Sequence, residues 1–326
     1  MSVAFVTGGS GFVGRNLIPY LTARGVTVRA LARSDAAADA VKKLGAEPVR
    51  GDLATPLPPF PIEPLRGADV VYHAGAFVDV WGDEREAFAI NVGGTQRVLD
   101  AARAAGVPRF VHVSTEAVLV GGPKIRNADE TWPRPRRPIG LYPRTKGQAE
   151  ERVEAANGPG LATIIARPRF IWGAGDTTLL PELVKGARNG ALMWIGGGRY
   201  LTSTCHVRNV CEGLVKAAER GTPGGTYFLT DGEPVPFRDF IEALLRTQGV
   251  EPPTRSAPRA LVRAFSFTSD AVARALRLGR PRLPYTAFLL IGEEVTVSDA
   301  RARRELGYVG EVARAEGLRE LAAARI

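Results

Sequence analysis

The segment Thr7-Gly8-Gly9-Ser10-Gly11-Phe12-Val13-Gly14 decides how the first half of the chain folds. It follows a short apolar, strand-favouring run at residues 2–7, and the next apolar residues have helical spacing: Phe12, Val13, Leu17 and Leu21. In such a strand, glycine turn and helix, the first glycines permit the turn and a close approach of the backbone to a pyrophosphate. Gly14 then lets the helix pack near the strand. The free N–H groups at the amino end of the helix favour anions. We therefore expect a dinucleotide to be bound by Gly8, Gly9, Ser10, Gly11, Phe12, Val13 and Gly14.

Strand-like and helix-like segments alternate through the first half of the chain. The pattern predicts strands at residues 2–7, 26–32, 47–50, 70–73, 110–113 and 162–166, and helices at 35–44, at about 85–105 and from the segment of Tyr142 to about 157. This alternation predicts an α/β fold with a doubly wound parallel sheet of the Rossmann type. Five prolines between Pro56 and Pro64 predict extended coil in place of the crossover helix between the third and fourth strands.

The alternation fades after Arg167-Pro168. The remaining chain mixes apolar, aromatic and glycine-rich segments, including Trp172, residues 194–198 and Tyr227-Phe228-Leu229, which we expect in a smaller region that covers the substrate. We expect residues 1–168 to form the dinucleotide-binding core and residues 169–326 to be mainly substrate-binding, with some segments returning to the core.

Composition excludes several classes of protein. The chain has 326 residues, 45% of them hydrophobic and 24% charged, which is ordinary for a soluble globular enzyme. It has no targeting segment and no apolar run long enough to span a bilayer, so we expect a cytoplasmic protein. Two cysteines and three dispersed histidines predict no metal site. His73 and His112 lie in predicted buried strands, where we expect hydrogen-bonded core residues.

The net charge of +9 raises the question of a nucleic-acid partner. The arginines are scattered rather than arranged in a stripe, so we expect no nucleic-acid binding. The exception is residues 255–282, which carry seven arginines and one acid among apolar residues: Leu261, Val262, Phe265, Val272, Leu276 and Leu278. This basic amphipathic stretch has two interpretations: a solvated helix whose apolar side caps the pocket, or a peripheral contact with a membrane surface.

Tyr142 and Lys146 form a Tyr-x-x-x-Lys pair. Four residues apart on a helix, the two side chains project from one face, so the ammonium can lie beside the phenol and favour its ionised form. Tyr142 is therefore a candidate proton donor and acceptor near neutral pH. Together with the glycine loop, the pair indicates nicotinamide redox chemistry.

These segments resemble the extended short-chain dehydrogenase/reductase family, within its branch of 3β-hydroxysteroid dehydrogenase-like proteins and NAD-dependent epimerases and dehydratases. The matching segments, in order along nearly the whole chain, are 7–14, 51–53, 73–76, 91–95, 113–115, 142–146, 167–168 and 206–207. The resemblance implies that Asp52 and Leu53 contact adenine. It implies that Ala74, Gly75 and Ala76 admit the ribose and phosphates, and that Lys146 binds the nicotinamide ribose. Asn91 would order the site, the backbone of Pro168 would contact the carboxamide, and Val113 would join Tyr142 among the cofactor-binding residues.

The third catalytic residue of the family is a hydroxyl at the end of the fifth strand, where Ser114 and Thr115 are adjacent. Side chains alternate along a strand, so only one of the two should face the nicotinamide. Placing the family pattern at Phe110 selects Thr115, with Ser114 left as the alternative. The hydroxyl would donate to the substrate carbonyl oxygen, where negative charge develops as hydride adds to carbon.

The choice of cofactor depends on the end of the second strand. A free ribose diol requires an acidic acceptor there, whereas a 2′-phosphate requires a cation. The sequence is Leu31-Ala32-Arg33, in which the acid is absent and Arg33 follows. This favours NADP(H). NAD(H), with Arg33 stacked on adenine, is the alternative.

The expected substrate is hydrophobic. Thr202 stands where nucleotide-sugar epimerases of the family usually have a phosphate-binding arginine, although the nearby Arg199 is an alternative anchor. Apolar and aromatic residues dominate the candidate substrate contacts, which are Val78, Trp81, Glu116, Phe170, Trp172, Leu180, Trp194 and Tyr200.

We therefore expect an NADP(H)-dependent ketone reductase or alcohol dehydrogenase acting on a sterol-like, polyketide-like, aromatic-ring or β-keto alkyl compound. Two alternatives stay open: a nucleotide-sugar epimerase or dehydratase that retains its NAD, and a non-enzymatic redox sensor or scaffold that binds a dinucleotide. The resemblance also implies a homodimer.

Overall fold

A computed structural model describes residues 2–55 and 60–324. In this part of the chain, seven strands form one parallel sheet in the order β11-β6-β5-β4-β1-β2-β3. The strands are β1 (Val3–Thr7), β2 (Thr27–Ala32), β3 (Glu47–Arg50), β4 (Val70–His73), β5 (Arg109–Val113), β6 (Ala162–Pro168) and β11 (Thr226–Leu229). The predicted doubly wound α/β fold is confirmed, because the strand order reverses at β1, which lies between β4 and β2.

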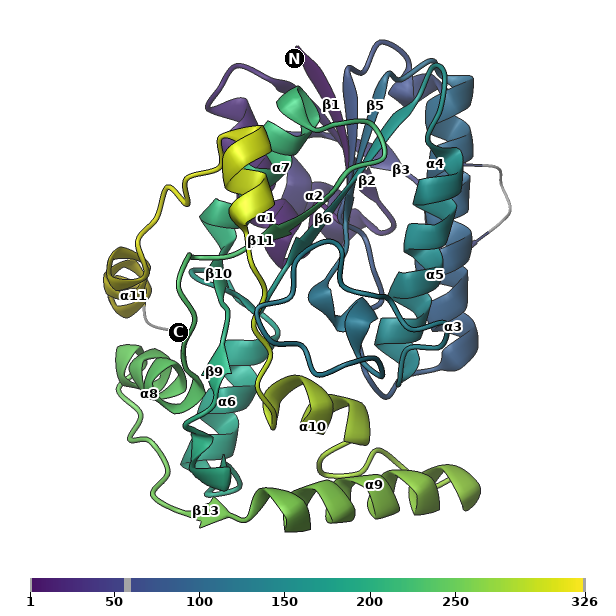
Figure 1. Cartoon of the computed structure of the whole chain (residues 1–326). Helices are drawn as coiled ribbons and strands as arrows, with labels where there is room; N and C mark the ends of the chain where they lie inside the picture. The colour runs from purple at the N-terminus through teal and green to yellow at the C-terminus, as the bar shows by residue number, and fades with distance from the viewer. Residues whose placement is uncertain (1, 56–59, 325–326) are drawn as a thin grey trace.

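Helices cover both faces of this sheet (Figure 1). On one face lie α1 (Phe12–Thr22), α2 (Asp35–Lys43) and α7 (Val207–Arg220), whose buried residues Leu17, Val41 and Leu214 belong to one core cluster. On the other face lie α4 (Thr95–Ala104) and α5 (Leu141–Ala156), whose residues Val98 and Val153 belong to a second cluster. The sheet is therefore buried on both sides, as its continuous apolar strands require.

The predicted helix at 85–105 is interrupted. It consists of α3 (Glu84–Phe88), a π-helical segment, η2 (Ala89–Gly94), and α4. A side chain at Gly94 would come within 2.9 Å of the Leu53 carbonyl oxygen, so the helix packs tightly against the segment that follows β3. Such π segments are frequent at functional sites.

The crossover from β3 to β4 is coil from residue 60 to 62, followed by a single 3₁₀ turn, η1 (Glu63–Leu65), consistent with its prolines. Pro56, Pro58 and Pro59 lie outside the described residues.

The expectation that Tyr227-Phe228-Leu229 covers the substrate is wrong. These residues form β11, the edge strand of the central sheet, and Tyr227 pairs with Ala166 of β6. All three side chains are buried. The chain therefore returns to the sheet after an excursion, and the division at residue 168 stays a proposal.

The remaining segments form a smaller region beside the carboxyl ends of the strands (Figure 1). Its short strand pairs are β7 (Ile171–Trp172) with β10 (Cys205–His206), β9 (Leu201–Thr202) with β12 (Val235–Pro236), and β8 (Trp194–Ile195) with β13 (Ser256–Ala257). Its helices are α6 (Leu179–Arg188), α8 (Phe237–Thr247), α9 (Arg259–Ala275), α10 (Tyr285–Ile291) and α11 (Arg314–Ala323). Short helical turns complete the described elements: η3 (Glu116–Leu119), η4 (Gly196–Gly198) and η5 (Ala302–Leu306). None of the helices in the described residues has the length and apolar character needed to cross a bilayer.

Helix α5 is attached to β6 by a buried carboxylate. Glu150 is fully buried and accepts from Arg167 Nε at 2.8 Å and Nη2 at 2.6 Å, and from Arg134 Nη1 at 2.7 Å. Burial opposes ionisation of Glu150, but Arg167 and Arg134 outweigh it and lower the pKa of Glu150. The ion pairs determine how α5 lies on the sheet.

We predict that Glu150→Gln lowers the free energy of unfolding by about 3 kcal/mol, because it leaves two guanidinium groups without their buried carboxylate. Urea unfolding at neutral pH measures this. Glu151→Gln, on the exposed side of the same helix, is the matched control and should change stability by about 0.5 kcal/mol or less. Equal effects of the two substitutions would show that the buried pair does not stabilise the fold.

Candidate active site

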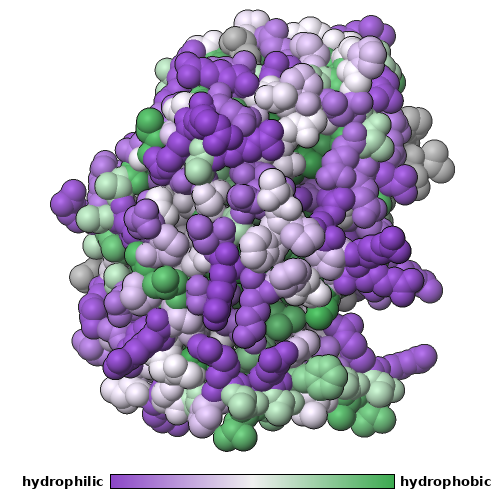
Figure 2. Space-filling model, in the orientation of Figure 1, coloured by the Kyte–Doolittle hydropathy of each residue, from purple (hydrophilic) through white to green (hydrophobic). Residues whose placement is uncertain are grey.

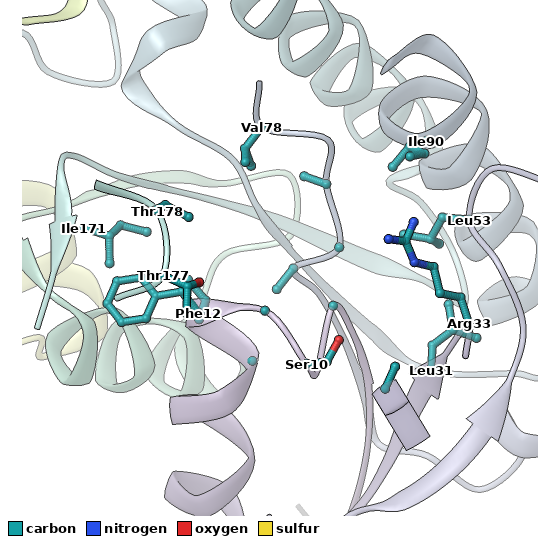
Figure 3. A pocket seen from close by; sticks show the side chains of 18 of the residues that line it. Ser10, Phe12, Leu31, Arg33, Leu53, Val78, Ile90, Ile171, Thr177 and Thr178 are labelled. Carbon is teal, nitrogen blue, oxygen red and sulfur yellow. The ribbon is translucent and has the colours of Figure 1, made fainter. Parts of the chain in front are cut away.

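A cavity of about 700 Å³ opens at the carboxyl ends of the central strands, where the strand order reverses (Figure 3). Ligands of doubly wound folds bind at this place. Its wall includes the predicted cofactor residues Gly8, Ser10, Gly11, Phe12, Val13, Gly14, Arg33, Asp52, Leu53, Ala74, Gly75, Ala76 and Tyr142. The smaller region adds Phe170, Ile171, Thr177, Thr178 and Leu179. The cavity therefore lies between the sheet and the smaller region.

At two positions of the glycine loop, the surrounding backbone leaves no room for a Cβ atom. Gly8 has φ of +70°, and a Cβ there would come within 2.6 Å of the backbone nitrogen of Gly75. A Cβ on Gly14 would come within 2.2 Å of the Gly8 carbonyl oxygen. The loop, the start of α1 and the segment after β4 thus approach one another as a dinucleotide site requires.

The amino end of α1 suits a phosphate. Its N-cap is Gly11, which provides no side-chain cap, and its first turn holds no acidic residue. The free N–H groups of this turn border the cavity, because Phe12, Val13 and Gly14 line its wall. The residues present therefore fit the pyrophosphate of a dinucleotide.

The opposite end of the cavity carries Arg33 and Leu53, as Figure 3 shows. The Arg33 side chain is exposed and makes no ion pair or hydrogen bond with any residue that the structure describes. Asp52 accepts from the backbone N–H of Ala54 at 2.9 Å, which orients its carboxylate. A guanidinium without a partner and an oriented carboxylate are therefore available at this end.

Tyr142 lies in the first turn of α5 and lines the cavity. Burial raises the pKa of Tyr142, the Glu116 carboxylate raises it further, and the Thr115 hydroxyl opposes the shift. The phenol is therefore protonated at neutral pH. The expected lowering of its pKa by Lys146 is not observed, because the Lys146 side chain points to β5 and donates from Nζ to the Val113 carbonyl oxygen at 2.8 Å.

Lys146 is buried beside a histidine. Its Nζ is 3.1 Å from His112 Nε2. Burial lowers the pKa of Lys146 to about 8, with Glu150 opposing the shift. Burial and the Lys146 charge lower the pKa of His112, which is therefore neutral and accepts the hydrogen bond at Nε2. Among the described residues, His112 Nδ1 has no partner, so His112 is not the satisfied core residue we expected.

His73 is the satisfied core histidine. Its ring stacks on His112 with 5.3 Å between centroids. Thr95 Oγ1 donates to the Asn91 carbonyl oxygen, so it accepts from His73 Nε2 at 2.9 Å. His73 Nδ1 then accepts from Thr7 Oγ1 at 2.7 Å. Burial lowers the pKa of His73 to about 3, which keeps this tautomer neutral.

The two candidate hydroxyls have different surroundings. Thr115 Oγ1 accepts from the Ala117 N–H at 3.2 Å and donates to Glu116 Oε2 at 2.9 Å. Thr115 also lies close enough to Tyr142 to lower its pKa. Ser114 is close enough to Glu150 to lower the pKa of that carboxyl, although Ser114 Oγ has no well-aligned hydrogen bond among the described residues. Thr115 is thus the hydroxyl beside the phenol.

Glu116 is neutralised by Arg169, whose Nη1 lies 2.7 Å from Glu116 Oε1. Both side chains are 4% exposed. Arg169 also donates to the Leu290 carbonyl oxygen at 2.7 Å, so the pair connects the site to the smaller region. The pair places a compensated carboxylate next to Thr115.

Asn91 connects the segment after β4 to α5. Its Oδ1 accepts from Phe77 N at 2.7 Å, and its Nδ2 donates to Thr145 Oγ1 at 2.9 Å. This arrangement fits the ordering role that the resemblance implies. Gly9, Asn91, Val113, Lys146 and Pro168 do not line the cavity among the described residues. The same holds for the two candidate catalytic hydroxyl residues, Ser114 and Thr115.

The substrate candidates divide into two groups. Val78 and Phe170 line the cavity. Phe170 has φ of +47°, an uncommon conformation for a bulky residue and one that occurs at functional sites. The other candidates, Trp81, Glu116, Trp172, Leu180, Trp194 and Tyr200, are absent from the described cavity wall.

Three of these residues belong to a core instead. Trp172, Leu180 and Trp194 are almost fully buried in the apolar cluster of the smaller region. The Trp172 indole donates to Asp231 at 2.7 Å, and that of Trp194 donates to the Pro253 carbonyl oxygen at 2.6 Å. Tyr200 stacks on Phe237 with 5.3 Å between centroids. The smaller region needs its own core, and its largest aromatic residues form part of it.

Sequence reasoning missed His112 and Arg169 as neighbours of the catalytic groups. His112 could have been found from strand alternation, since it projects from the same face of β5 as Ser114. Arg169 follows the Arg167-Pro168 motif, but no spacing connects it to Glu116. Sequence reasoning also did not identify Ile171, Thr177 and Thr178 as part of the cavity wall.

Comparisons with known proteins identify the family of the chain. Residues 5–259 match the 3-beta hydroxysteroid dehydrogenase/isomerase family. The chain is 50% identical over 318 residues to the 4-hydroxy-2-methyl-3-oxo-4-farnesyl-3,4-dihydroquinoline-1-oxide ketoreductase of Stigmatella aurantiaca, covering 96% of this chain and 94% of the relative. It is 37% identical over 347 residues to a 2-alkyl-3-oxoalkanoate reductase of Stenotrophomonas maltophilia, covering 98% of each.

Among solved structures, the crystal structure of gox2253 superposes with a TM-score of 0.81 at 28% identity, covering 99% of this chain and 98% of that chain. The fold, the tyrosine and lysine on α5 and the sequence matches agree. The chain belongs to the 3-beta hydroxysteroid dehydrogenase/isomerase family and is an oxidoreductase of the extended short-chain dehydrogenase/reductase type.

Proposed function

We propose that this protein is an NADP(H)-dependent reductase of hydrophobic ketones. The observation that carries the proposal is one continuous cavity, lined by the glycine loop, Tyr142 and the apolar side chains of Val78 and Phe170. The relatives at 50% and 37% identity are named for a 3-oxo dihydroquinoline and a 3-oxoalkanoate. Both names support an aromatic-ring or β-keto alkyl substrate.

The residues then have separate roles. The nicotinamide, when bound, supplies the hydride that adds to the carbonyl carbon. Tyr142 donates its phenolic proton to the carbonyl oxygen, and its raised pKa keeps that proton in place until then. Thr115 turns its hydroxyl proton from Glu116 to the same oxygen. Arg169 keeps the Glu116 carboxylate paired when this bond is lost.

Lys146 acts as a buried positive charge beside this reaction. With a pKa of about 8, the Lys146 side chain is charged at neutral pH and loses its charge as the pH rises through that pKa. Val113 and His112 hold the ammonium. Lys146 does not line the described cavity, so its proposed contact with the nicotinamide ribose requires Nζ to turn from these two partners. We therefore expect activity to fall as the pH rises through the pKa of Lys146.

Arg33 supports NADP(H) over NAD(H). Its guanidinium is exposed in the cavity wall and has no ion pair or hydrogen bond within residues 2–55 and 60–324, and β2 ends without a carboxylate at Ala32. A 2′-phosphate would pair with Arg33, whereas a free ribose diol finds no acidic acceptor at this point.

The nucleotide-sugar alternative has less support. Thr202 is buried, and its Oγ1 accepts a hydrogen bond from Arg169 Nη2 at 3.3 Å. Arg199 is exposed and lies outside the described cavity wall. A diphosphate would therefore lack a cation from these two positions. A scaffold role would leave Tyr142, Lys146 and Thr115 without a purpose. A cytoplasmic homodimer stays part of the proposal.

A screen of NADPH oxidation tests the function. Ketones graded by size and polarity are compared with a sugar nucleotide. Turnover that rises with apolar size supports the reductase. Tightly retained cofactor with turnover of only the sugar nucleotide would favour the epimerase, and no hydride transfer at all would favour the scaffold.

Tyr142→Phe should lower kcat by about a hundredfold or more with unchanged cofactor affinity, because only the transferable proton is removed. Stopped-flow hydride transfer and fluorescence titration with NADPH measure the two quantities. Turnover equal to wild type would reject Tyr142 as the acid.

Arg33→Asp should raise the KM for NADPH much more than that for NADH, since the substitution removes the cation and introduces a repelling carboxylate. Steady-state kinetics with both cofactors give the ratio. Arg15→Asp, an exposed arginine near the loop but outside the described cavity wall, is the control for general charge. An unchanged ratio for Arg33→Asp would exclude the phosphate contact.

His112→Phe should move the alkaline limb of the kcat/KM profile to lower pH by about one to two units, because a hydrogen bond to a charged group contributes about 1.5–3 kcal/mol. His112→Gln keeps an acceptor for Lys146 and should restore most of the wild-type profile. If both variants titrate like the wild type, His112 does not position the ammonium.

A further inference from the structure

Helix α9 (Arg259–Ala275) exposes its apolar side chains. Along the helix, only Ser266 and Ala273 are buried. Leu261 is 66% exposed, Phe265 56% and Val272 50%. Among the described residues, α9 contributes nothing to the cavity wall, so the expectation that its apolar side caps the pocket is wrong.

Four of the exposed apolar residues form one stripe, whereas Phe267, which is 57% exposed, projects from another side of the helix. Leu261, Phe265, Val272 and Leu276 are separated by four, seven and four residues, which places them within about 60° of one another around a helix. Figure 1 shows α9 at the lower edge of the molecule, and in Figure 2 apolar side chains gather along that edge. An exposed apolar stripe of this kind usually marks an interaction site.

The stripe lies among positive charges. Residues 255–282 contain seven arginines and a single acid, Asp270. Arg274 pairs with Asp270 at 2.9 Å, whereas the side chains of Arg277 and Arg282 have no ion pair or hydrogen bond with any described residue. An apolar stripe followed along the chain by Arg277 and Arg282, which have no partner among the described residues, is complementary to an anionic lipid surface.

Helix α9 and the segment that follows it contact the edge of the cavity. The Arg274 guanidinium lies over the Trp81 ring at 4.2 Å, and Arg280 pairs with Asp79 at 3.2 Å. The neighbouring Val78 is 55% exposed and also lines the cavity. Arg274 and Arg280 therefore connect the α9 segment to residues 78–81, and Val78 connects those residues to the cavity.

We propose that α9 and residues 78–81 form a docking surface for an anionic lipid bilayer. Leu261, Phe265, Val272 and Leu276 enter the interface, and the arginines contact the headgroups. The docked bilayer then lies beside Val78 at the edge of the cavity. This binding does not depend on the proposed reaction.

A second copy of the chain fits this surface less well. In a symmetric dimer through α9, the same patch lies on both subunits, so the arginines of one protomer face those of its partner. The segment has only Asp270 to compensate them, and Asp270 is already paired. Like charges brought together across an interface disfavour it.

Vesicle flotation of the full chain tests the proposal. The vesicles are phosphatidylcholine alone and phosphatidylcholine mixed with phosphatidylglycerol. The double variant Phe265→Gln, Leu276→Gln removes two residues of the stripe, and Arg277→Gln, Arg282→Gln removes two unpaired charges. Val309→Gln, at a residue 60% exposed outside α9, is the matched control.

Wild type and Val309→Gln should bind the anionic vesicles. The affinity of the stripe variant for these vesicles should be lower by at least about tenfold. The arginine variant should lose the preference for anionic over neutral vesicles. NADPH affinity and the circular dichroism spectrum should be equal in all four proteins, which shows that each is folded. Equal flotation of the stripe variant and wild type overturns the proposal. So does a wild-type dimer that ignores vesicles and dissociates in the stripe variant.

Discussion

The buried carboxylate of Glu150 attaches helix α5, which carries Tyr142 and Lys146, to β6, and the candidate site depends on it. Glu150 lies between Arg167 and Arg134 with no exposure to solvent. Tyr142, Lys146 and Glu150 follow one another at four-residue intervals on α5, so fixing one fixes the direction of the other two. A buried ion pair adds little net stability compared with an apolar pair, but separating its partners is costly. Rotation of α5 relative to β6 is therefore strongly disfavoured.

The second constraint is the exclusion of water around Lys146. The same desolvation lowers the pKa of Lys146 to about 8, lowers that of His73 to about 3 and raises that of Tyr142. At neutral pH these shifts leave one charged ammonium among neutral imidazoles and a protonated phenol. That combination suits a site that delivers a proton to a substrate oxygen beside a cofactor phosphate and ribose. The proposed docking surface on α9 is separate from this chemistry. It is connected to the site through residues 78–81 and through α10, whose Leu290 carbonyl accepts from Arg169.

Local pattern predicted most of the strands to within a residue or two, because each strand is a short apolar run bounded by turn residues. The π segment at Ala89–Gly94 has no such signal, since helical spacing continues across it. For another reason, the residues of strand β11 were predicted in the substrate-covering region rather than in the central sheet. A buried strand shows no alternation, and its partner β6 is separated from it by the whole of the first excursion into the smaller region.

The sequence by itself determined the glycine loop, the order of strands and helices in the core, and the pair of Tyr142 and Lys146, because all of these depend on spacings of a few residues. Only the tertiary structure decided that Lys146 contacts His112, 34 residues earlier, and that Arg169 neutralises Glu116, 53 residues earlier. It also decided that Trp172 and Trp194 fill a core while the apolar face of α9 stays exposed. The physical reason is the same in each case: burial and charge pairing depend on which distant segments meet, and no local spacing records that.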